Sequence, residues 1–109
     1  MTPYEVLLVR FPFSDIKVGK VRPALLLRSI EVPQLSTFYL VAMMTSNVSG
    51  LPFPDDIILT DWKDSGLPKP SLVRLAKLVT IDATLVKKSF GVLSAKDSKK
   101  IKKTLDNFF

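Results

Sequence analysis

Arginines and hydroxyl side chains are the residues of this sequence whose types and positions favour chemistry on a phosphate. Arg22 precedes Pro23, which begins an apolar segment and holds Arg22 out of the helical conformation. A guanidinium offers two parallel donors to phosphate oxygens and stays charged at any working pH. The same position also suits an exposed arginine that pairs with Asp15 or Glu5. Local sequence leaves both interpretations open.

Two hydroxyls, from Thr45 and Ser46, follow an apolar segment where a strand is expected to end. They can donate to phosphate oxygens, although hydroxyls at strand ends more often bind the backbone of the turn. Arg74 stands between Val73 and Leu75, and alternation along a strand sends it to the face opposite these neighbours. A cation in that position lines a site or pairs with an acid.

Lys20, Lys69 and Lys77 are expected to extend such a phosphate site, although each is an ordinary surface lysine by default. The net charge of +6 is uneven, because residues 1–68 carry −1 and residues 69–109 carry +7. A field of that sign attracts polyanions, nucleic acid first among them. The alternative is that the lysines solvate a helix face.

The absence of histidine and cysteine excludes several classes of function. Triads with an imidazole base, thiolate nucleophiles, disulfides and zinc sites built from these residues cannot form. A cluster of aspartates lacks the spacing of a calcium loop: Asp55, Asp56, Asp61 and Asp64. We therefore expect no metal site and no cofactor. Trp62, Phe108 and Phe109 could stack on bases, but such residues more often fill a core or an interface.

The chain has 109 residues, which is typical of one domain, so residues 1–109 are expected to form a single unit. Its longest apolar run, residues 38–44, is far shorter than the ~20 residues that a membrane helix needs. With no export signal visible, we expect a cytoplasmic protein that does not bind a membrane.

Short apolar segments separated by turn residues predict a mainly β fold of the α+β type. Strands are expected at residues 5–11, 24–28, 36–44, 57–60, 71–75, 77–81 and 90–93, with a loop at 62–70. A helix should begin at Ser94, because Ser94 and Asp97 fit a capping pattern and Ile101, Leu105 and Phe108 form one stripe. This pattern predicts a curved sheet or partly open barrel with a helix against it.

Five segments in order and in register resemble the PemK/MazF family of bacterial toxin ribonucleases, which belong to type II toxin–antitoxin pairs. They are YEVLLVRFPFSD at 4–15, RPALLL at 22–27, VAMMTSN at 41–47, GLPKPSLVRLAKLVTID at 66–82 and FGVLS at 90–94. Each segment alone is a weak signal, but together they cover most of the chain.

The resemblance implies a small SH3-like and CcdB-like barrel of short strands with a C-terminal helix, assembled as a homodimer. It also implies metal-independent cleavage of single-stranded RNA at short sequences, and inhibition by a cognate acidic antitoxin. The ribose 2′-hydroxyl would attack the adjacent phosphorus and leave a 2′,3′-cyclic phosphate and a 5′-hydroxyl.

The resemblance also assigns roles to particular residues. Arg22 takes the position of the arginine that stabilises the phosphate. Thr45 and Ser46 take the positions of the hydroxyl groups that bind the phosphate. Arg74 takes the position of a second arginine, which acts as a general acid or stabilises the oxyanion. Some family members place an aspartate two residues after the second arginine, where this chain has Ala76. The base that accepts the 2′-hydroxyl proton is therefore left open, with Glu5, Asp15, water or Arg22 as the candidates.

Two other functions are consistent with the same residues. The missing acid fits a catalytically impaired binding module that acts on RNA, an antitoxin or a protein target such as gyrase. Alternatively, the basic C-terminal helix serves only to dock an acidic antitoxin peptide.

Overall fold

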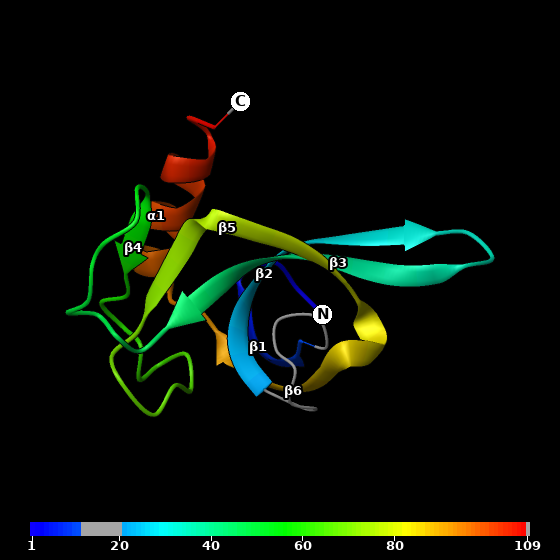
Figure 1. The fold of residues 1–109 in the computed structure, drawn as a ribbon, viewed down its shortest axis with the longest axis horizontal. Coiled ribbons are helices and arrows are strands. Elements are labelled where there is room, and N and C mark those ends of the chain that lie inside the picture. The colour runs from blue at the N-terminus through cyan, green and yellow to red at the C-terminus, as the bar shows by residue number, and fades with distance from the viewer. Residues whose placement is uncertain (12–20, 109) are drawn as a thin grey trace.

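The chain forms six β-strands and one α-helix, as a computed structural model of residues 1–11 and 21–108 shows (Figure 1). The strands are β1 (Glu5–Arg10), β2 (Val21–Val32), β3 (Ser36–Thr45), β4 (Asp56–Ile58), β5 (Leu72–Asp82) and β6 (Val86–Val92). A 3-10 turn, η1 (Ala83–Leu85), joins β5 to β6, and α1 (Ala95–Leu105) follows. No helix of the described residues is long and apolar enough to pass through a membrane.

All neighbouring strands pair antiparallel in one sheet, in the order β4-β5-β3-β2-β1-β6. The sheet curls on itself, and α1 lies over β5 near β4 (Figure 1). Because β4 and β6 are the edges of the hydrogen-bonded order, the curled sheet is a partly open barrel. The predicted mainly β fold with a C-terminal helix is confirmed.

The β2–β3 hairpin is longer than the sequence predicts. Strand β2 was expected at residues 24–28 but runs from Val21 to Val32, and it pairs with β3 as far as Val32 opposite Ser36. Polar residues such as Ser29 and Glu31 belong to this extension, so partner hydrogen bonds override their weak strand propensity. The end of the hairpin projects from the body of the molecule (Figure 1).

The segments predicted at residues 71–75 and 77–81 form the single strand β5. Its pairing with β3 shifts between Ala42 opposite Leu78 and Met43 opposite Arg74, so residues 75–77 have no partner on β3. An insertion of this kind bends a strand and increases its twist. Figure 1 shows β5 changing direction between its part beside β4 and its part beside the hairpin.

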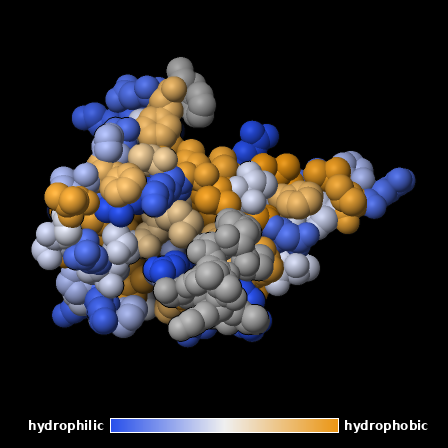
Figure 2. Space-filling view, viewed as in Figure 1, coloured by the Kyte–Doolittle hydropathy of each residue, from blue (hydrophilic) through white to orange (hydrophobic). Residues whose placement is uncertain are grey.

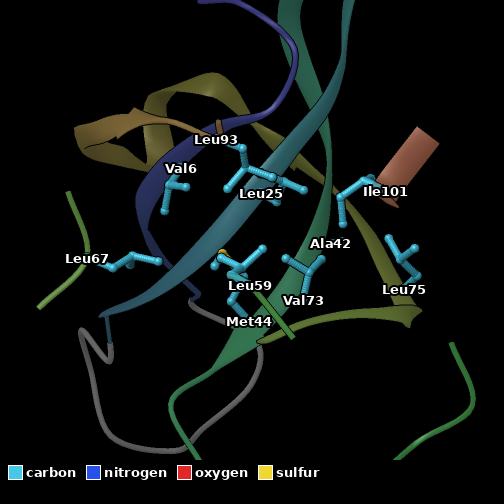
Figure 3. Close-up of a cluster of buried hydrophobic side chains, with 10 residues drawn as sticks. All are labelled: Val6, Leu25, Ala42, Met44, Leu59, Leu67, Val73, Leu75, Leu93 and Ile101. Atoms are coloured by element: carbon cyan, nitrogen blue, oxygen red, sulfur yellow. The ribbon is translucent and has the colours of Figure 1, made fainter. Parts of the chain in front are cut away.

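Two apolar clusters lie on opposite faces of the sheet. The first lies under α1 and β4 and contains Val6, Leu25, Ala42, Met44, Leu59, Leu67, Val73, Leu75, Leu93 and Ile101 (Figure 3). The second fills the inside of the curl and contains Leu7, Val9, Phe11, Ala24, Leu26, Val41 and Ile81. Strands buried on both faces explain why the apolar segments read as continuous runs rather than as alternating patterns.

Helix α1 is attached to the sheet by a buried carboxylate. The Ser94 hydroxyl accepts from the Asp97 backbone N–H at 3.2 Å, which confirms the predicted cap. The Asp97 side chain is fully buried and accepts from the backbone N–H groups of Thr60 (2.9 Å) and Asp61 (2.8 Å). Burial raises the pKa of Asp97, but these bonds and the Lys100 ammonium outweigh it, so the net pKa is lowered.

We predict that Asp97→Asn lowers the free energy of unfolding by about 2–3 kcal/mol, because an amide cannot accept both N–H groups. A carboxylate with a lowered folded pKa stabilises the fold above its unfolded pKa, and this contribution disappears as the pH falls through the folded value. As the pH falls below the ordinary pKa of 3.8, the free energy of unfolding should therefore decrease less in the variant than in the wild type. Urea unfolding across pH measures both effects.

The matched control is Asp64→Asn, since Asp64 is exposed in the nearby loop. This variant should unfold like the wild type at every pH. Equal stability of Asp97→Asn and Asp64→Asn would contradict the role assigned to Asp97.

Candidate functional site

The start of β2 and the end of β3 bring together two of the predicted residues. Ala24 pairs with Met43, and continuing this antiparallel register by two residues on each strand puts Arg22 opposite Thr45. Opposite residues of an antiparallel pair share one face, and Ala24 lies on the face of the second apolar cluster. Arg22 and Thr45 therefore extend that face at its polar end.

Two adjoining pockets open at this end of the sheet and share Arg22, Met44 and Thr45. The first pocket, of about 290 Å³, is lined by Val21, Arg22, Pro23, Met44, Thr45, Ser46, Leu67, Pro68, Lys69, Ser71 and Phe90. The second pocket, of about 340 Å³, is lined by Arg22, Met43, Met44, Thr45, Arg74 and Lys77. All the predicted site residues except Lys20, which lies outside the described residues, line one or both pockets.

Arg22 is exposed and has no acid within salt-bridge distance among the residues that the structure describes. Val9 of β1 pairs with Arg22, whereas Glu5 begins the same strand and pairs with Val92 of β6. Glu5 lies four positions before Val9 along the strand, or about 13 Å, so Glu5 is neither a partner of Arg22 nor a base at these pockets. Asp15, the other expected partner, lies outside the described residues.

Glu5 has its own partners at the far end of β1. A hydrogen bond from Ser89 and one from the Thr2 backbone N–H, at 3.0 Å, lower the pKa of its carboxyl. Its carboxylate therefore holds the N-terminal turn against β6.

The Thr45 hydroxyl accepts from the Asn47 backbone N–H at 3.1 Å, so it does cap the turn, as the alternative interpretation held. A hydroxyl has a second lone pair and its own proton, and these remain for a ligand in the pockets. Ser46 is exposed and lines only the first pocket.

Arg74 is held by an acid and an aromatic ring. Its Nε and Nη2 donate to the two carboxylate oxygens of Asp56, each at 3.1 Å, and both side chains are largely buried. The guanidinium lies 4.0 Å from the ring centroid of Phe53. Arg74 therefore both lines a pocket and pairs with an acid, and its remaining N–H groups are the ones left for a ligand.

Asp56 organises this arrangement. The bond from Arg74 lowers the pKa of its carboxyl, with a further contribution from the Phe53 backbone N–H, which donates to Oδ2 at 2.9 Å. The carboxylate therefore fixes Arg74 and the turn that carries Phe53 at once. The ammonium of Lys77 lies 5.0 Å from the same ring, so two cations flank it.

Residues 2–109 match the family described as the PemK-like, MazF-like toxin of type II toxin-antitoxin systems. This chain belongs to that family. A solved structure described as Mycobacterium tuberculosis toxin MazF-mt6 is 25% identical, with a TM-score of 0.66, and the match covers 97% of this chain and 94% of that one.

A second solved structure, an endoribonuclease in complex with its cognate antitoxin from mycobacterial species, shares the fold. Its TM-score is 0.72 at 11% identity, and the match covers 98% of this chain and 92% of that one. Comparison with curated proteins finds no match.

In this PemK/MazF-family chain, Ala76 lies exposed in the unpaired part of β5, and the acid that contacts Arg74 comes from another strand. Sequence reasoning missed Asp56 and Phe53, because it grouped Asp56 with the other aspartates and passed over Phe53 as a base-stacking candidate.

Trp62 and Phe108 pack against the first apolar cluster, which favours their predicted structural role. No group of three or more acidic side chains in the described part of the chain could hold a metal ion.

The loop that carries Lys69 is held against β6 by two glycines. Gly66 has φ +85°, and a Cβ there would collide with the carbonyl oxygen of Phe90. Gly91, on β6, faces the backbone of Ser65 in the same way. This close contact seats Leu67 in the core and leaves Lys69 at the first pocket.

We predict that Gly66→Ala lowers the free energy of unfolding by about 1–3 kcal/mol, because it adds backbone strain to a collision with fixed backbone. Gly50→Ala is the matched control, since a Cβ there meets only the side-chain amide of Asn47. Its effect should stay within about 0.5 kcal/mol. Urea unfolding of both variants tests this, and a tolerated Gly66→Ala would contradict the close packing of loop and strand.

Proposed function

We propose that this chain is a toxin endoribonuclease that cleaves single-stranded RNA. The observation that carries the proposal is the convergence of Arg22, Thr45 and Arg74 on two adjoining pockets in a chain of the PemK/MazF family. Two guanidinium groups and a hydroxyl suit a phosphodiester and its charged transition state. The sequence predicts a cytoplasmic protein, and an RNA substrate is consistent with that location.

The proposed reaction takes its nucleophile from the substrate. The 2′-hydroxyl oxygen bonds to the adjacent phosphorus and loses its proton, while the bond from phosphorus to the 5′-oxygen breaks and that oxygen gains a proton. The products are a 2′,3′-cyclic phosphate and a 5′-hydroxyl. This chemistry needs no side-chain nucleophile, which accords with a chain that contains neither histidine nor cysteine.

In this proposal the protein acts mainly by stabilising charge. Arg22, which has no acidic partner among the described residues, binds the phosphate, and Thr45 adds a hydroxyl donor. Arg74 contributes through the N–H groups that Asp56 leaves unused. Asp56 is a weak proton acceptor, because its bond to Arg74 lowers its pKa. Ser46, Lys69 and Lys77, which line the pockets, would bind the RNA on either side of the cleaved bond. Lys20, outside the described residues, stays a predicted RNA contact.

We predict that the purified chain cleaves single-stranded RNA in the presence of EDTA, since the two arginines supply the positive charge. Arg22→Ala should lower the rate on the order of 10²–10³-fold, the loss expected for a transition-state contact. Lys87→Ala is the control for loss of one positive charge, because Lys87 is exposed on β6 and lies outside both pockets. Mass analysis of the fragments should give 2′,3′-cyclic phosphate and 5′-hydroxyl ends.

Intact RNA, or cleavage that EDTA abolishes, would overturn this mechanism. The second candidate is a binding module without catalysis, which is favoured by Ala76 at the position where some family members have an aspartate. Salt-dependent RNA binding with no turnover would support that alternative.

We also propose that the chain forms a homodimer through the projecting hairpin. Ile30 pairs with Phe38 and Arg28 with Leu40, so the apolar residues Ile30, Phe38 and Leu40 share one face. None of these three packs against either apolar cluster, and Figure 2 shows hydrophobic surface along the hairpin and toward α1. Such a strip fits a partner subunit.

We predict that Phe38→Lys raises the dimer dissociation constant by at least about thirtyfold, since a central aromatic at an interface contributes about 2 kcal/mol or more. Asp82 pairs with Phe38 across the sheet and can accept the new charge, so the variant should fold. Thr37→Lys places the same charge on the opposite face, beside Glu31, and should leave the dimer intact. Sedimentation equilibrium compares the two, and a dimer equally stable in both would exclude this face.

A further inference from the structure

Phe53 is an exposed aromatic residue beside the candidate site. It lies in the loop between β3 and β4, is 37% exposed, and is part of neither apolar cluster. An aromatic ring gains most of its stabilisation from burial, so the exposed surface of this ring is available for a further contact. Both cations that contact the ring, Arg74 and Lys77, also line the second pocket of the candidate site.

The backbone of Phe53 is fixed on both sides by Asp56. The Phe53 carbonyl accepts from the Asp56 backbone N–H at 3.3 Å, and the Phe53 N–H donates to the Asp56 carboxylate at 2.9 Å. Pro54 and Asp55 form the centre of this tight turn, and Asp55 has φ +64°, as the third residue of a type II turn does. The residue is therefore held in place before a ligand arrives, which reduces the entropy lost on binding.

The cations beside the ring put contacts for a phosphate and for a base within reach of one ligand. The Arg74 guanidinium lies 4.0 Å and the Lys77 ammonium 5.0 Å from the ring centroid of Phe53. Lys77 is exposed and has no acid within salt-bridge distance in the described part of the chain. Proteins that bind single-stranded nucleic acid combine cations along the backbone with aromatic rings that stack on the bases. The combination therefore favours a nucleotide as the ligand of this ring.

We propose that Phe53 stacks on a base of the bound strand and so contributes to the choice of the sequence that is cleaved. Two strand spacings, about 10 Å, separate β5, which carries Arg74, from β2, which carries Arg22. The stacked base therefore belongs to a nucleotide beside the bond that Arg22 binds. Because sequence preference at such contacts comes from stacking strength, the larger ring system of a purine is favoured over a pyrimidine.

This inference rests on the proposed function only in taking single-stranded nucleic acid as the ligand. The experiment measures, by fluorescence anisotropy, the affinity of the full chain for two short, labelled single strands of DNA. One carries adenine at every position, and the other has the same backbone without bases. The proposed reaction cannot cleave either strand, because deoxyribose has no 2′-hydroxyl. Phe53→Leu should raise the Kd for the adenine strand at least about fivefold and that for the abasic strand less than about twofold.

Three further variants serve as controls. Leu51→Ala should leave both affinities unchanged, since Leu51 is 90% exposed in the same loop and has no aromatic ring. Phe53→Tyr keeps the ring and should retain the wild-type affinity for the adenine strand. Lys77→Ala removes a phosphate contact and should weaken binding to both strands equally. A thymine strand should bind the wild type more weakly than the adenine strand, and this difference should disappear in Phe53→Leu.

Equal weakening of both strands by Phe53→Leu would assign the ring to the positioning of Arg74 and overturn the stacking contact. No effect of Phe53→Leu, or an equal loss in Phe53→Tyr, would also overturn it. An RNA cleavage assay separates this result from the proposed function. Cleavage by a wild type in which Phe53→Leu has no base-dependent effect overturns the stacking alone. A base-dependent loss in a chain that leaves RNA intact would refute the ribonuclease and leave the stacking contact standing.

Discussion

The unpaired residues 75–77 of β5 are the constraint on which both the core and the candidate site depend. Before them, Arg74 pairs with β3 and β4 and turns toward the pockets, while Val73 and Leu75 point into the first apolar cluster. After them, Leu78 and the rest of the strand follow the hairpin. One strand can therefore join the short edge strand β4 to the curled body of the sheet.

The bend also explains how the site keeps an acid beside Arg74. Two residues after this arginine, where the resemblance implies an aspartate in some family members, this chain has Ala76, which is exposed in the bend. Asp56 approaches instead from β4, directly opposite Arg74 in the register, and binds it with both oxygens. A carboxylate bound in this way holds the guanidinium in place and is a poor base.

Local signals predicted most of the fold, because they are carried by neighbouring residues. Hydrophobic runs located the strands, and Ser94 marked the start of α1. The bend in β5 and the length of β2 depend on partners distant in the chain, and no local pattern reports them. The same limit applies to the site. Arg22, Thr45 and Arg74 were found by their types and by resemblance, whereas Asp56 is recognisable only once β4 lies beside β5.

Some cations of this molecule pair with acids and stabilise the fold, whereas others have no acidic partner and can bind a ligand. Arg74 of β5 meets the largely buried carboxylate of Asp56 on β4. Lys100 meets the buried carboxylate of Asp97 on the same helix, and both of these side chains also bind the segment that follows β4. Arg22 and the remaining lysines of α1 have no such partner among the described residues. Acids thus meet the cations that serve packing, whereas Arg22 at the pockets keeps its guanidinium for a ligand. The excess charge of +7 in residues 69–109 therefore includes cations that pair with acids inside the fold. Only the cations without such a partner are available to an anionic ligand.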